Sequence, residues 1–276
     1  MLKRYWRLTS VTLVIIGVTL VLFFVWPQKK IGAELIFLDV GQGDAMLIKT
    51  PYGQTVLVDG GPDALVLKGL GRYLPWSDRS LSAVLLTHPH DDHLFGLIRV
   101  GERYSSEQIF TGFRIATSAP YQAWLERVAT TTPLKTGQRL IFGPDCYLEV
   151  LSDGRLASND NDGSLVTKFV YDNFSVLLPG DLGLKGENIL LVASSSILNA
   201  DILKIGHHGS AESSSEAWLK AVSPKLTVIS VGMDNRYGHP SLRILNRLDR
   251  LGLSYKRTDQ EGDIHVWSDG QSFVVK

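Results

Sequence analysis

The stretch "LLTHPHDDHLFG", residues 85–96, places three histidines and two aspartates in six positions directly after an apolar run. One interpretation is a turn before a helix, in which Asp91 or Asp92 caps a helix that starts near His93. That interpretation leaves the three imidazoles without a role, and they would repel one another when protonated. Neutral imidazole nitrogens and carboxylate oxygens suit divalent ions such as zinc. The stretch is therefore predicted to bind metal at a turn between a strand and a helix.

Composition sets the class of protein. The chain has 276 residues, of which 44% are hydrophobic, enough for one large domain or two modest ones with a buried core. Its formal net charge is zero, so contact with a polyanion depends on local patches rather than on a global basic field. Its single cysteine, Cys146, excludes an intramolecular disulfide and a cysteine-rich zinc module. Histidine and aspartate are left as the metal ligands.

The N-terminal segment differs from the rest of the chain. Residues 8–26 carry no charge, and as a helix they would cover about 28 Å, close to the ~30 Å hydrocarbon thickness of a bilayer. More basic residues precede this segment than follow it, which favours a cytoplasmic N-terminus. A cleaved signal peptide is the alternative, but its apolar region is usually only ~7–15 residues long. We therefore predict a cytoplasmic stub, one transmembrane helix and a linker in residues 1–32, and an extracytoplasmic globular domain in residues 33–276.

Within the globular domain, short runs rich in Val, Ile and Leu indicate strands that are buried on both faces, and segments with helical spacing lie between them. The apolar runs are residues 33–41, 55–61, 82–90, 175–181, 201–209 and 226–232. Helical spacing occurs in residues 64–74, 93–104, 120–130, 214–222 and 241–252. This pattern predicts an α/β fold of several layers.

Four residues of metal-ligand type stand at the ends of apolar runs: Asp59, His88, Asp181 and His207. In open α/β sheets, ligands gather beyond the carboxyl ends of the strands. Aspartate often ends strands in any case, but histidine has no comparable preference for turns. We therefore expect these side chains to meet on one rim of the sheet.

The arrangement His88-x-His90-x-Asp92-His93 after an apolar strand resembles the signature of metallo-β-lactamase-fold hydrolases. The resemblance covers nearly all of residues 33–276. Five further stretches resemble the C-terminal extracytoplasmic domain of ComEC-type competence DNA-uptake proteins and their free-standing relatives: "DVGQGDA" (39–45), "VDGG" (58–61), "LLPGD" (177–181), "GHHGS" (206–210) and "NRYGHP" (235–240). The resemblance implies a four-layer αββα sandwich with a two-metal site between the sheets.

The same resemblance implies roles for individual residues. It places His88 and His90 on the first metal, places Asp92, His93 and His207 on the second, and makes Asp181 a bridge between them. Asp59 would hydrogen-bond to a ligating histidine and fix its tautomer, although an aspartate that starts a Gly-Gly turn is the equal alternative. His208 is left beside the substrate.

Two features depart from the family pattern. The fold usually supplies a third histidine to the first metal from the central region, but no histidine lies between His93 and His207. The matching stretch is residues 159–166, where Asn161, or alternatively Asp162, would donate an oxygen. In ComEC-type domains the second histidine of the first motif is often an aspartate, whereas here it is His90.

Two divalent ions about 3.5–4 Å apart suit the hydrolysis of phosphodiesters, lactams or thioesters alike. The residues that favour a phosphodiester come later in the chain. Arg236 presents a guanidinium that matches phosphate oxygens, and His239 is suited to protonate a leaving alkoxide. Asp44, in the glycine-rich "DVGQGD", is predicted to hydrogen-bond near the metals. Arginines 243, 247 and 250 alternate with leucines, which indicates the solvated face of an amphipathic helix.

The sequence thus predicts a membrane-anchored phosphodiesterase or nuclease that acts on DNA outside the cytoplasm, with Asp92, His208 and His239 as catalytic residues. Its cofactors would be two divalent ions, zinc or else manganese. The predicted partners are DNA or another phosphodiester, the membrane, and a separate DNA-uptake channel. One alternative is a hydrolase of another ester, such as a cell-wall phosphodiester or a lactone. A second is a catalytically silent module that binds DNA or a partner, which the missing central histidine favours.

Overall fold

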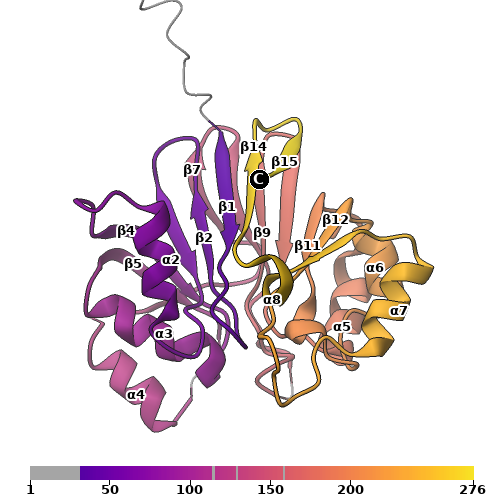
Figure 1. Cartoon of the computed structure of the whole chain (residues 1–276), viewed down its shortest axis with the longest axis horizontal. Helices are drawn as coiled ribbons and strands as arrows, with labels where there is room; N and C mark the ends of the chain where they lie inside the picture. The colour runs from indigo at the N-terminus through magenta and orange to yellow at the C-terminus, as the bar shows by residue number, and fades with distance from the viewer. Residues whose placement is uncertain (1–31, 114–115, 129, 158) are drawn as a thin grey trace, which may run out of the picture. The chain divides into compact units, whose positions relative to one another are not determined.

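The computed structural model describes residues 32–276, apart from 114–115, 129 and 158 (Figure 1). The transmembrane helix predicted in residues 8–26 lies outside the described residues. Among the described residues, none of the helices has the length and apolar character needed to cross a bilayer.

Two sheets form the centre of the domain (Figure 1). The first has the strand order β15 (Phe273–Val275), β14 (Ile264–Ser268), β1 (Ala33–Phe37), β2 (Met46–Lys49), β3 (Thr55–Val58), β4 (Ser80–Leu86), β5 (Ser105–Thr111) and β6 (Thr132–Pro133). The second has the order β13 (Tyr255–Arg257), β12 (Leu226–Ile229), β11 (Ile202–Lys204), β10 (Phe174–Leu178), β9 (Val166–Tyr171), β8 (Cys146–Ser152) and β7 (Arg139–Gly143).

Each sheet has a parallel part, and these parts set the position of the site. In the first sheet, β3 to β6 are parallel, and Val58 pairs with Leu85. In the second, β10 to β13 are parallel, and Leu177 pairs with Leu203. Because parallel strands end at the same edge of a sheet, the residues after β3 and β4 meet at one edge, and those after β10 and β11 at another.

Helices cover the outer face of each sheet. On the first sheet lie α2 (Leu65–Tyr73), α3 (Asp91–Gly101) and α4 (Ala119–Leu125), and on the second lie α5 (Leu184–Ser194), α6 (Glu216–Val222) and α7 (Leu242–Arg250). The remaining helical segments are η1 (Ser195–Ile197), η2 (Gly206–Gly209) and α8 (Thr258–Glu261). The four layers are therefore helices, sheet, sheet and helices.

Successive residues of one strand face different layers. Leu35 and Phe37 of β1 belong to the core between the sheets, whereas Ile36 packs with the helices of the first sheet. In β10, Val176 faces the other sheet and Leu177 faces the helices of the second. Strands with two buried faces need continuous apolar runs. The predicted α/β class and αββα architecture are confirmed.

The start of α3 differs from the expected cap. Asp91 and Asp92 are the first two residues of the helix, and His90 occupies the N-cap position without a side-chain capping hydrogen bond. The aspartates do not cap the helix, but their negative charges lie in its first turn, where the helix dipole favours them. The carboxylate of Asp92 is therefore free to point into the site.

Helix α3 is held tightly against the turn after β3. The Gly60 N–H donates to the carbonyl of His93 at 2.7 Å, and the Gly96 N–H donates to the carbonyl of Gly61 at 2.9 Å. A Cβ on Gly96 would lie 1.7 Å from the carbonyl oxygen of Gly60. Only glycine allows this approach, which places His93 beside Asp59.

Gly96→Ala is expected to lower the free energy of unfolding by at least about 2 kcal/mol, because neither backbone segment has room to move. Gly101→Ala is the matched control: it lies in the same helix, and its Cβ would meet nothing within 4 Å. Alanine there is expected to leave stability unchanged or raise it by up to about 1 kcal/mol. Urea unfolding of the two variants measures the difference, and equal effects would contradict the close approach.

Candidate metal centre

Residues at the ends of four strands line one rim between the two sheets. Asp59 follows β3, His88 follows β4 after Thr87, Asp181 follows β10, and the turn η2 follows β11. All four residues for which the sequence predicted a common rim lie there, although His207 is less deeply placed than the others. Asp181 lies at the centre, since its oxygens are 3.9 Å from Nε2 of His88 and 3.4 Å from Nε2 of His93.

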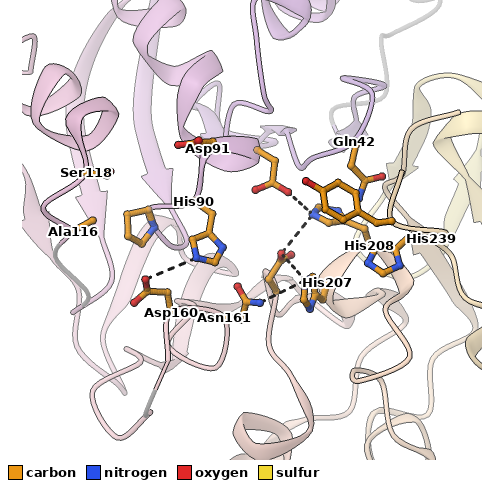
Figure 2. A pocket seen from close by; sticks show the side chains of 14 residues that line it. Gln42, His90, Asp91, Ala116, Ser118, Asp160, Asn161, His207, His208 and His239 are labelled. Atoms are coloured by element: carbon orange, nitrogen blue, oxygen red, sulfur yellow. Dashed lines mark hydrogen bonds and ion pairs between the residues drawn. The ribbon is translucent and has the colours of Figure 1, made fainter. Parts of the chain in front are cut away.

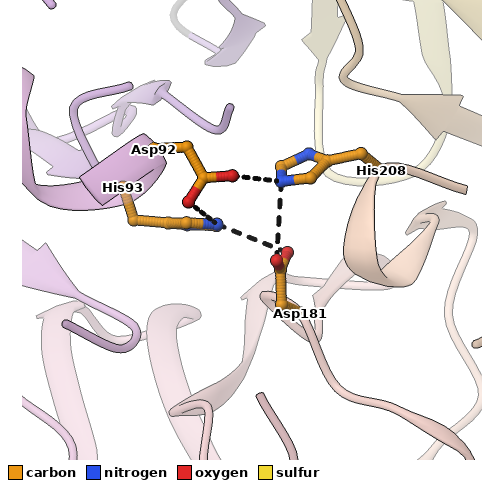
Figure 3. A group of neighbouring side chains, drawn as sticks. All are labelled: Asp92, His93, Asp181 and His208. Atoms are coloured by element: carbon orange, nitrogen blue, oxygen red, sulfur yellow. Dashed lines mark ion pairs between the residues drawn. The ribbon is translucent and has the colours of Figure 1, made fainter. Parts of the chain in front are cut away.

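Four side chains on this rim form a group that could hold a metal ion: Asp92, His93, Asp181 and His208 (Figure 3). Nε2 of His208 lies 3.3 Å from Asp92 Oδ2 and 3.5 Å from Asp181 Oδ2. Nε2 of His93 lies 3.9 Å from Asp92 Oδ1. One ligand atom of each residue lies within 4.8 Å of the others. We call these four residues the central cluster.

Hydrogen bonds at Nδ1 orient the imidazoles of the central cluster. Nδ1 of His93 donates to Asp59 Oδ2 at 2.8 Å, and Asp59 also accepts from the N–H and the hydroxyl of Thr87, each at 2.8 Å. Nδ1 of His208 donates to the carbonyl of Ser230 at 3.0 Å. A hydrogen bond at Nδ1 fixes the tautomer and leaves Nε2 for a metal. Asp59 thus hydrogen-bonds to a histidine of the central cluster.

Backbone strain accompanies this arrangement. Asp59, His207 and His208 have φ values of 58°, 50° and 52°, in the left-handed region that non-glycine residues rarely adopt. Such conformations cost on the order of 1–3 kcal/mol each and persist where the surrounding structure holds them, most often at functional sites.

The central cluster fits a divalent cation. Nε2 of His88, His93 and His208, together with Oδ1 of Asp181, are buried and lack a hydrogen-bond partner among the described residues. A buried polar atom without a partner costs about 1–3 kcal/mol. Imidazole nitrogens and carboxylate oxygens are ligands that zinc and related metals prefer. A cation in the central cluster would give the atoms of His93, His208 and Asp181 a partner, and His88 lies beside the cluster, with Nε2 3.9 Å from Asp181 Oδ2.

Charge determines the protonation of the cluster. Burial favours neutral imidazole at His93 and His208, but the negative charge of Asp181 outweighs it and holds the pKa of both histidines well above the usual value. Burial of Asp181 opposes its ionisation, but His208 and His93 outweigh that effect and hold its pKa well below the usual value. At His88, burial lowers the pKa, and the positive charge of His93 lowers it further.

We therefore expect metal binding to release protons and to weaken as the pH falls. His93 and His208 have raised pKa values, so they hold protons at neutral pH that must leave before Nε2 binds a metal. Lowering the pH strengthens this competition, and raising it removes the competition. Calorimetric titration with Zn²⁺ in buffers of different ionisation enthalpy should give about two protons released per ion, one from each of these histidines. Heats that do not depend on the buffer would contradict the expectation.

The cluster opens into a cavity of about 430 Å³ (Figure 2). Its wall includes His90, Asn161 and His239 in addition to members of the cluster. His239 is half-buried, its ring lies 5.8 Å from that of His207, and Tyr237 stacks on it with a centroid distance of 5.9 Å. Burial lowers the pKa of His239, and the nearby His207 and His208 lower it further. The arrangement brings an imidazole that can exchange protons to the mouth of a metal-ligand cluster.

A family model places this fold and these ligands in context. Residues 38–232 match the model of the metallo-beta-lactamase superfamily. The chain belongs to the metallo-beta-lactamase superfamily. The resemblance to this superfamily drawn from the sequence is confirmed. Its members are typically metal-dependent hydrolases.

Curated proteins of two bacteria are similar to most of this chain. The chain is 31% identical over 268 residues to ComE operon protein 3 of Bacillus subtilis (strain 168), covering 88% of this chain and 34% of that protein. It is also 31% identical over 241 residues to competence protein ComA of Neisseria gonorrhoeae, covering 86% of this chain and 32% of that protein. The chain spans about a third of the length of these relatives.

Solved structures support the fold. The metallo-beta-lactamase fold protein YhfI of Bacillus subtilis has a TM-score of 0.53 at 13% identity, covering 81% of this chain and 95% of that one. Zn²⁺-bound PqqB of Methylobacterium extorquens has a TM-score of 0.51 at 11% identity, covering 82% of this chain and 97% of that one. At these identities the likeness concerns the fold alone.

The tandem histidines differ in burial and in their neighbours. From the sequence, His207 is predicted to bind the second metal, with His208 beside the substrate. In the structure, His208 is buried in the central cluster, and His207 is 30% exposed, with Nε2 3.8 Å from Asp181 Oδ2. The left-handed backbone at both residues turns the chain sharply, so the second histidine points inward toward Ser230.

The residues expected at the first metal are less closely grouped. The rings of His88 and His90 are 4.5 Å apart, but Nε2 of His90 faces Asp160 Oδ2 at 3.8 Å, and the side chain of His90 is about half exposed. Asn161 lines the cavity beside His207, with Nδ2 3.5 Å from Nε2 of that histidine. Its Oδ1 is buried without a partner among the described residues.

Three other residues of the sequence analysis are placed as follows. Asp162, the alternative to Asn161, accepts hydrogen bonds from Asn159 and from the Gly186 N–H, which hold its own loop. Arg236 is exposed and lies outside the cavity wall, with its guanidinium 5.1 Å from the ring of Tyr237. Asp44 is buried and pairs with Lys204.

Lys204 is a residue of the site that the sequence did not predict. It is the last residue of β11 and is buried beside Asp181. Burial opposes its charge, but Asp44 and Asp181 outweigh that effect and raise the pKa of Lys204. A lysine inside the apolar run "DILKIG" was the available signal, because an isolated ammonium is rarely buried without a partner.

Proposed function

We propose that this protein is a metal-dependent phosphodiesterase that cleaves DNA outside the cytoplasm. The observation that carries the proposal is the central cluster, whose unpartnered imidazole nitrogens surround Asp181 at the floor of an open cavity. The competence proteins among the relatives favour a nucleic acid as the substrate.

Some residues of the site would bind the metal ions, and His239 would transfer a proton. Two divalent ions, zinc or else manganese, would supply a water of lowered pKa and polarise the phosphoryl oxygens. Asp92, His93, Asp181 and His208 would hold one ion, and His88, His90, Asn161 and His207, with Asp181 shared, would hold the other. His239 lines the same cavity, with its ring 5.8 Å from that of His207, and a phosphodiester bound there would place negative charge beside its ring. That charge favours the protonated imidazole, which then donates its proton to the leaving group.

Tyr237 and Arg236 support a nucleic-acid substrate. The ring of Tyr237 is 54% exposed at the cavity mouth, and it is fixed by His239 on one side and by a hydrogen bond from Arg236 to its hydroxyl at 3.0 Å. Exposed aromatic rings stack with nucleobases, and a guanidinium binds phosphate. The pair would hold the nucleotide next to the scissile bond.

The protein would be anchored in the cell membrane. Residues 8–26 would anchor the protein by a single transmembrane helix with the N-terminus in the cytoplasm, and the catalytic domain would act beside a separate DNA-uptake channel. The apolar character of this segment and the competence relatives support this arrangement. Membrane fractionation of cells that express the full chain tests it, and a shortened chain in the soluble fraction would contradict it.

The activity is tested with the purified full chain. Single-stranded DNA, double-stranded DNA and bis(p-nitrophenyl) phosphate are incubated with Zn²⁺ or Mn²⁺. Cleavage is expected with the metal, is expected to stop with EDTA, and is expected to be lost in Asp92→Ala. The matched control is Asp91→Ala, which removes the neighbouring exposed carboxylate and leaves the central cluster intact.

The other outcomes separate the alternatives. Full activity in Asp92→Ala would overturn the proposal. Hydrolysis of a lactone or a cell-wall phosphodiester in preference to DNA would favour a different ester as the substrate. Fewer than about one bound ion per chain would contradict a two-metal hydrolase and would favour a catalytically silent binding module.

A further inference from the structure

A buried ion pair lies directly behind the central cluster. Lys204 has only 4% of its side chain exposed, and its ammonium pairs with Asp44 Oδ2. The same ammonium lies 3.7 Å from Asp181 Oδ1 and donates a hydrogen bond to the carbonyl of Gly180 at 3.1 Å. Two carboxylates therefore share one ammonium, and one of them is the central residue of the metal-ligand group.

The position of Asp44 is fixed by the backbone around it. Its N–H donates to the carbonyl of Asp92 at 3.2 Å, and its carbonyl accepts from the Gly61 N–H at 2.7 Å. A Cβ on the preceding Gly43 would lie 2.3 Å from the carbonyl oxygen of Asp92. The glycine-rich turn "DVGQGD" therefore packs closely against Asp92 and places the carboxylate of Asp44 behind the central cluster.

Asp44 also reaches the imidazoles. Its Oδ1 lies 3.4 Å from Nδ1 of His208, and its Oδ2 lies 3.9 Å from Nδ1 of His93. The ion pair thus lies on the side of the histidines opposite the atoms that face Asp181 and Asp92. It comes from both sheets, since Asp44 lies in the loop between β1 and β2, and Lys204 ends β11.

The geometry sets a competition for Asp181. An ammonium and a divalent ion both seek its carboxylate, and Lys204 is too deeply buried to turn to solvent. While Asp44 binds the ammonium of Lys204, Asp181 Oδ1 stays 3.7 Å from that ammonium, and the negative charge of Asp181 remains available to a metal. If Asp44 lost its charge, Asp181 would be the carboxylate left for the ammonium, because an unpaired buried charge costs several kcal/mol.

We propose that Asp44 is a positioning residue for the metal centre: by binding Lys204 it keeps the ammonium from competing with the metal for Asp181. Lys204 in turn fixes the turn at Gly180 that presents Asp181. The inference rests on the metal binding in the proposed function, and it does not depend on DNA as the substrate.

Asp44→Asn tests the inference through metal binding rather than activity. The full chain is titrated with Co²⁺, and both the dissociation constant and the visible absorption bands are recorded. We expect the dissociation constant to rise about 10- to 100-fold, as for other residues that orient metal ligands, and the absorption bands to change. Asp39→Asn, in the same loop but exposed and outside the cluster, is the matched control and should bind as the unaltered protein does.

The double variant Asp44→Asn with Lys204→Met separates positioning from folding. Removing the ammonium ends the competition, so the double variant should recover at least about tenfold of the lost affinity, since contacting residues couple strongly. A double variant that binds Co²⁺ no better than Asp44→Asn would overturn the inference, as would an unchanged titration in Asp44→Asn. If the unaltered chain bound no Co²⁺, both the proposed function and this inference would be wrong. If the unaltered chain bound Co²⁺ strongly and Asp44→Asn bound it equally well, only this inference would be wrong.

Discussion

Replacing Asp181 by asparagine is expected to abolish metal binding and hydrolysis together. Four imidazoles face this carboxylate, with the Nε2 atoms of His88, His93, His207 and His208 at 3.9, 3.4, 3.8 and 3.5 Å from its oxygens. Asparagine keeps the size of the side chain but removes the charge that the two proposed metal positions would share. We expect kcat/KM to fall by about 10³-fold or more, which corresponds to roughly 4 kcal/mol of transition-state stabilisation.

Metal content and activity should be measured on the same preparation of Asp181→Asn. Elemental analysis is expected to find less than one ion per chain after dialysis, because a shared carboxylate serves both positions. Near-ultraviolet circular dichroism checks that the variant is folded. A folded variant that retains two ions per chain would show that Asp181 does not bridge them.

The site's location was predictable because it follows from strand geometry. The apolar runs that end at Asp59, His88 and Asp181 are buried on both faces, and such runs are recognisable without knowledge of the pairing. Parallel strands bring the residues that follow them to one edge, so the common rim follows from the pattern. The glycines at 60 and 96 complete the arrangement, because they let α3 approach the turn after β3.

The antiparallel part of the second sheet was not predictable in the same way. In β7, burial alternates, with Ile141 66% exposed between half-buried neighbours, but residue type does not, because Leu140, Ile141 and Phe142 are all apolar. Three apolar residues are too few to identify a buried strand by pattern. Strands of this kind are fixed by their partners, here β8, rather than by their own composition.

Side-chain placements that depend on backbone conformation or on partners distant in the sequence were also not predictable. His207 and His208 are chemically identical, and the left-handed backbone of the turn decides which one points inward. Lys204 acquires its role through Asp44, a residue of the other sheet, and no local pattern connects them. The sequence therefore predicts which residue types act as ligands better than it predicts which of two adjacent residues faces the site.

The different placement of the two histidines leads to the second large effect. His208→Asn is expected to weaken binding of Zn²⁺ at the central cluster by about 100-fold or more, since it removes one of four ligands of that position and exceeds the 10- to 100-fold typical of residues that only orient ligands. His207→Asn is expected to weaken it by less than about tenfold, because His207 is partly exposed and lies outside the central cluster. The two substitutions change the same residue type at adjacent positions.

Competition titrations with a chromophoric zinc chelator measure both variants under one set of conditions. A second readout separates the roles further: the ion at the central cluster should be lost from His208→Asn, whereas His207→Asn should keep it and lose only the second ion proposed beside Asn161. Among the described residues, the imidazole of His207 contacts Asn161 Nδ2 at 3.5 Å, whereas His208 Nδ1 donates a buried hydrogen bond to Ser230 at 3.0 Å. Removal of His207 should therefore leave the turn after β11 more stable than removal of His208 does. The opposite order of affinities would restore His207 as the ligand of the central cluster and would require the turn to adopt another backbone conformation when a metal is bound.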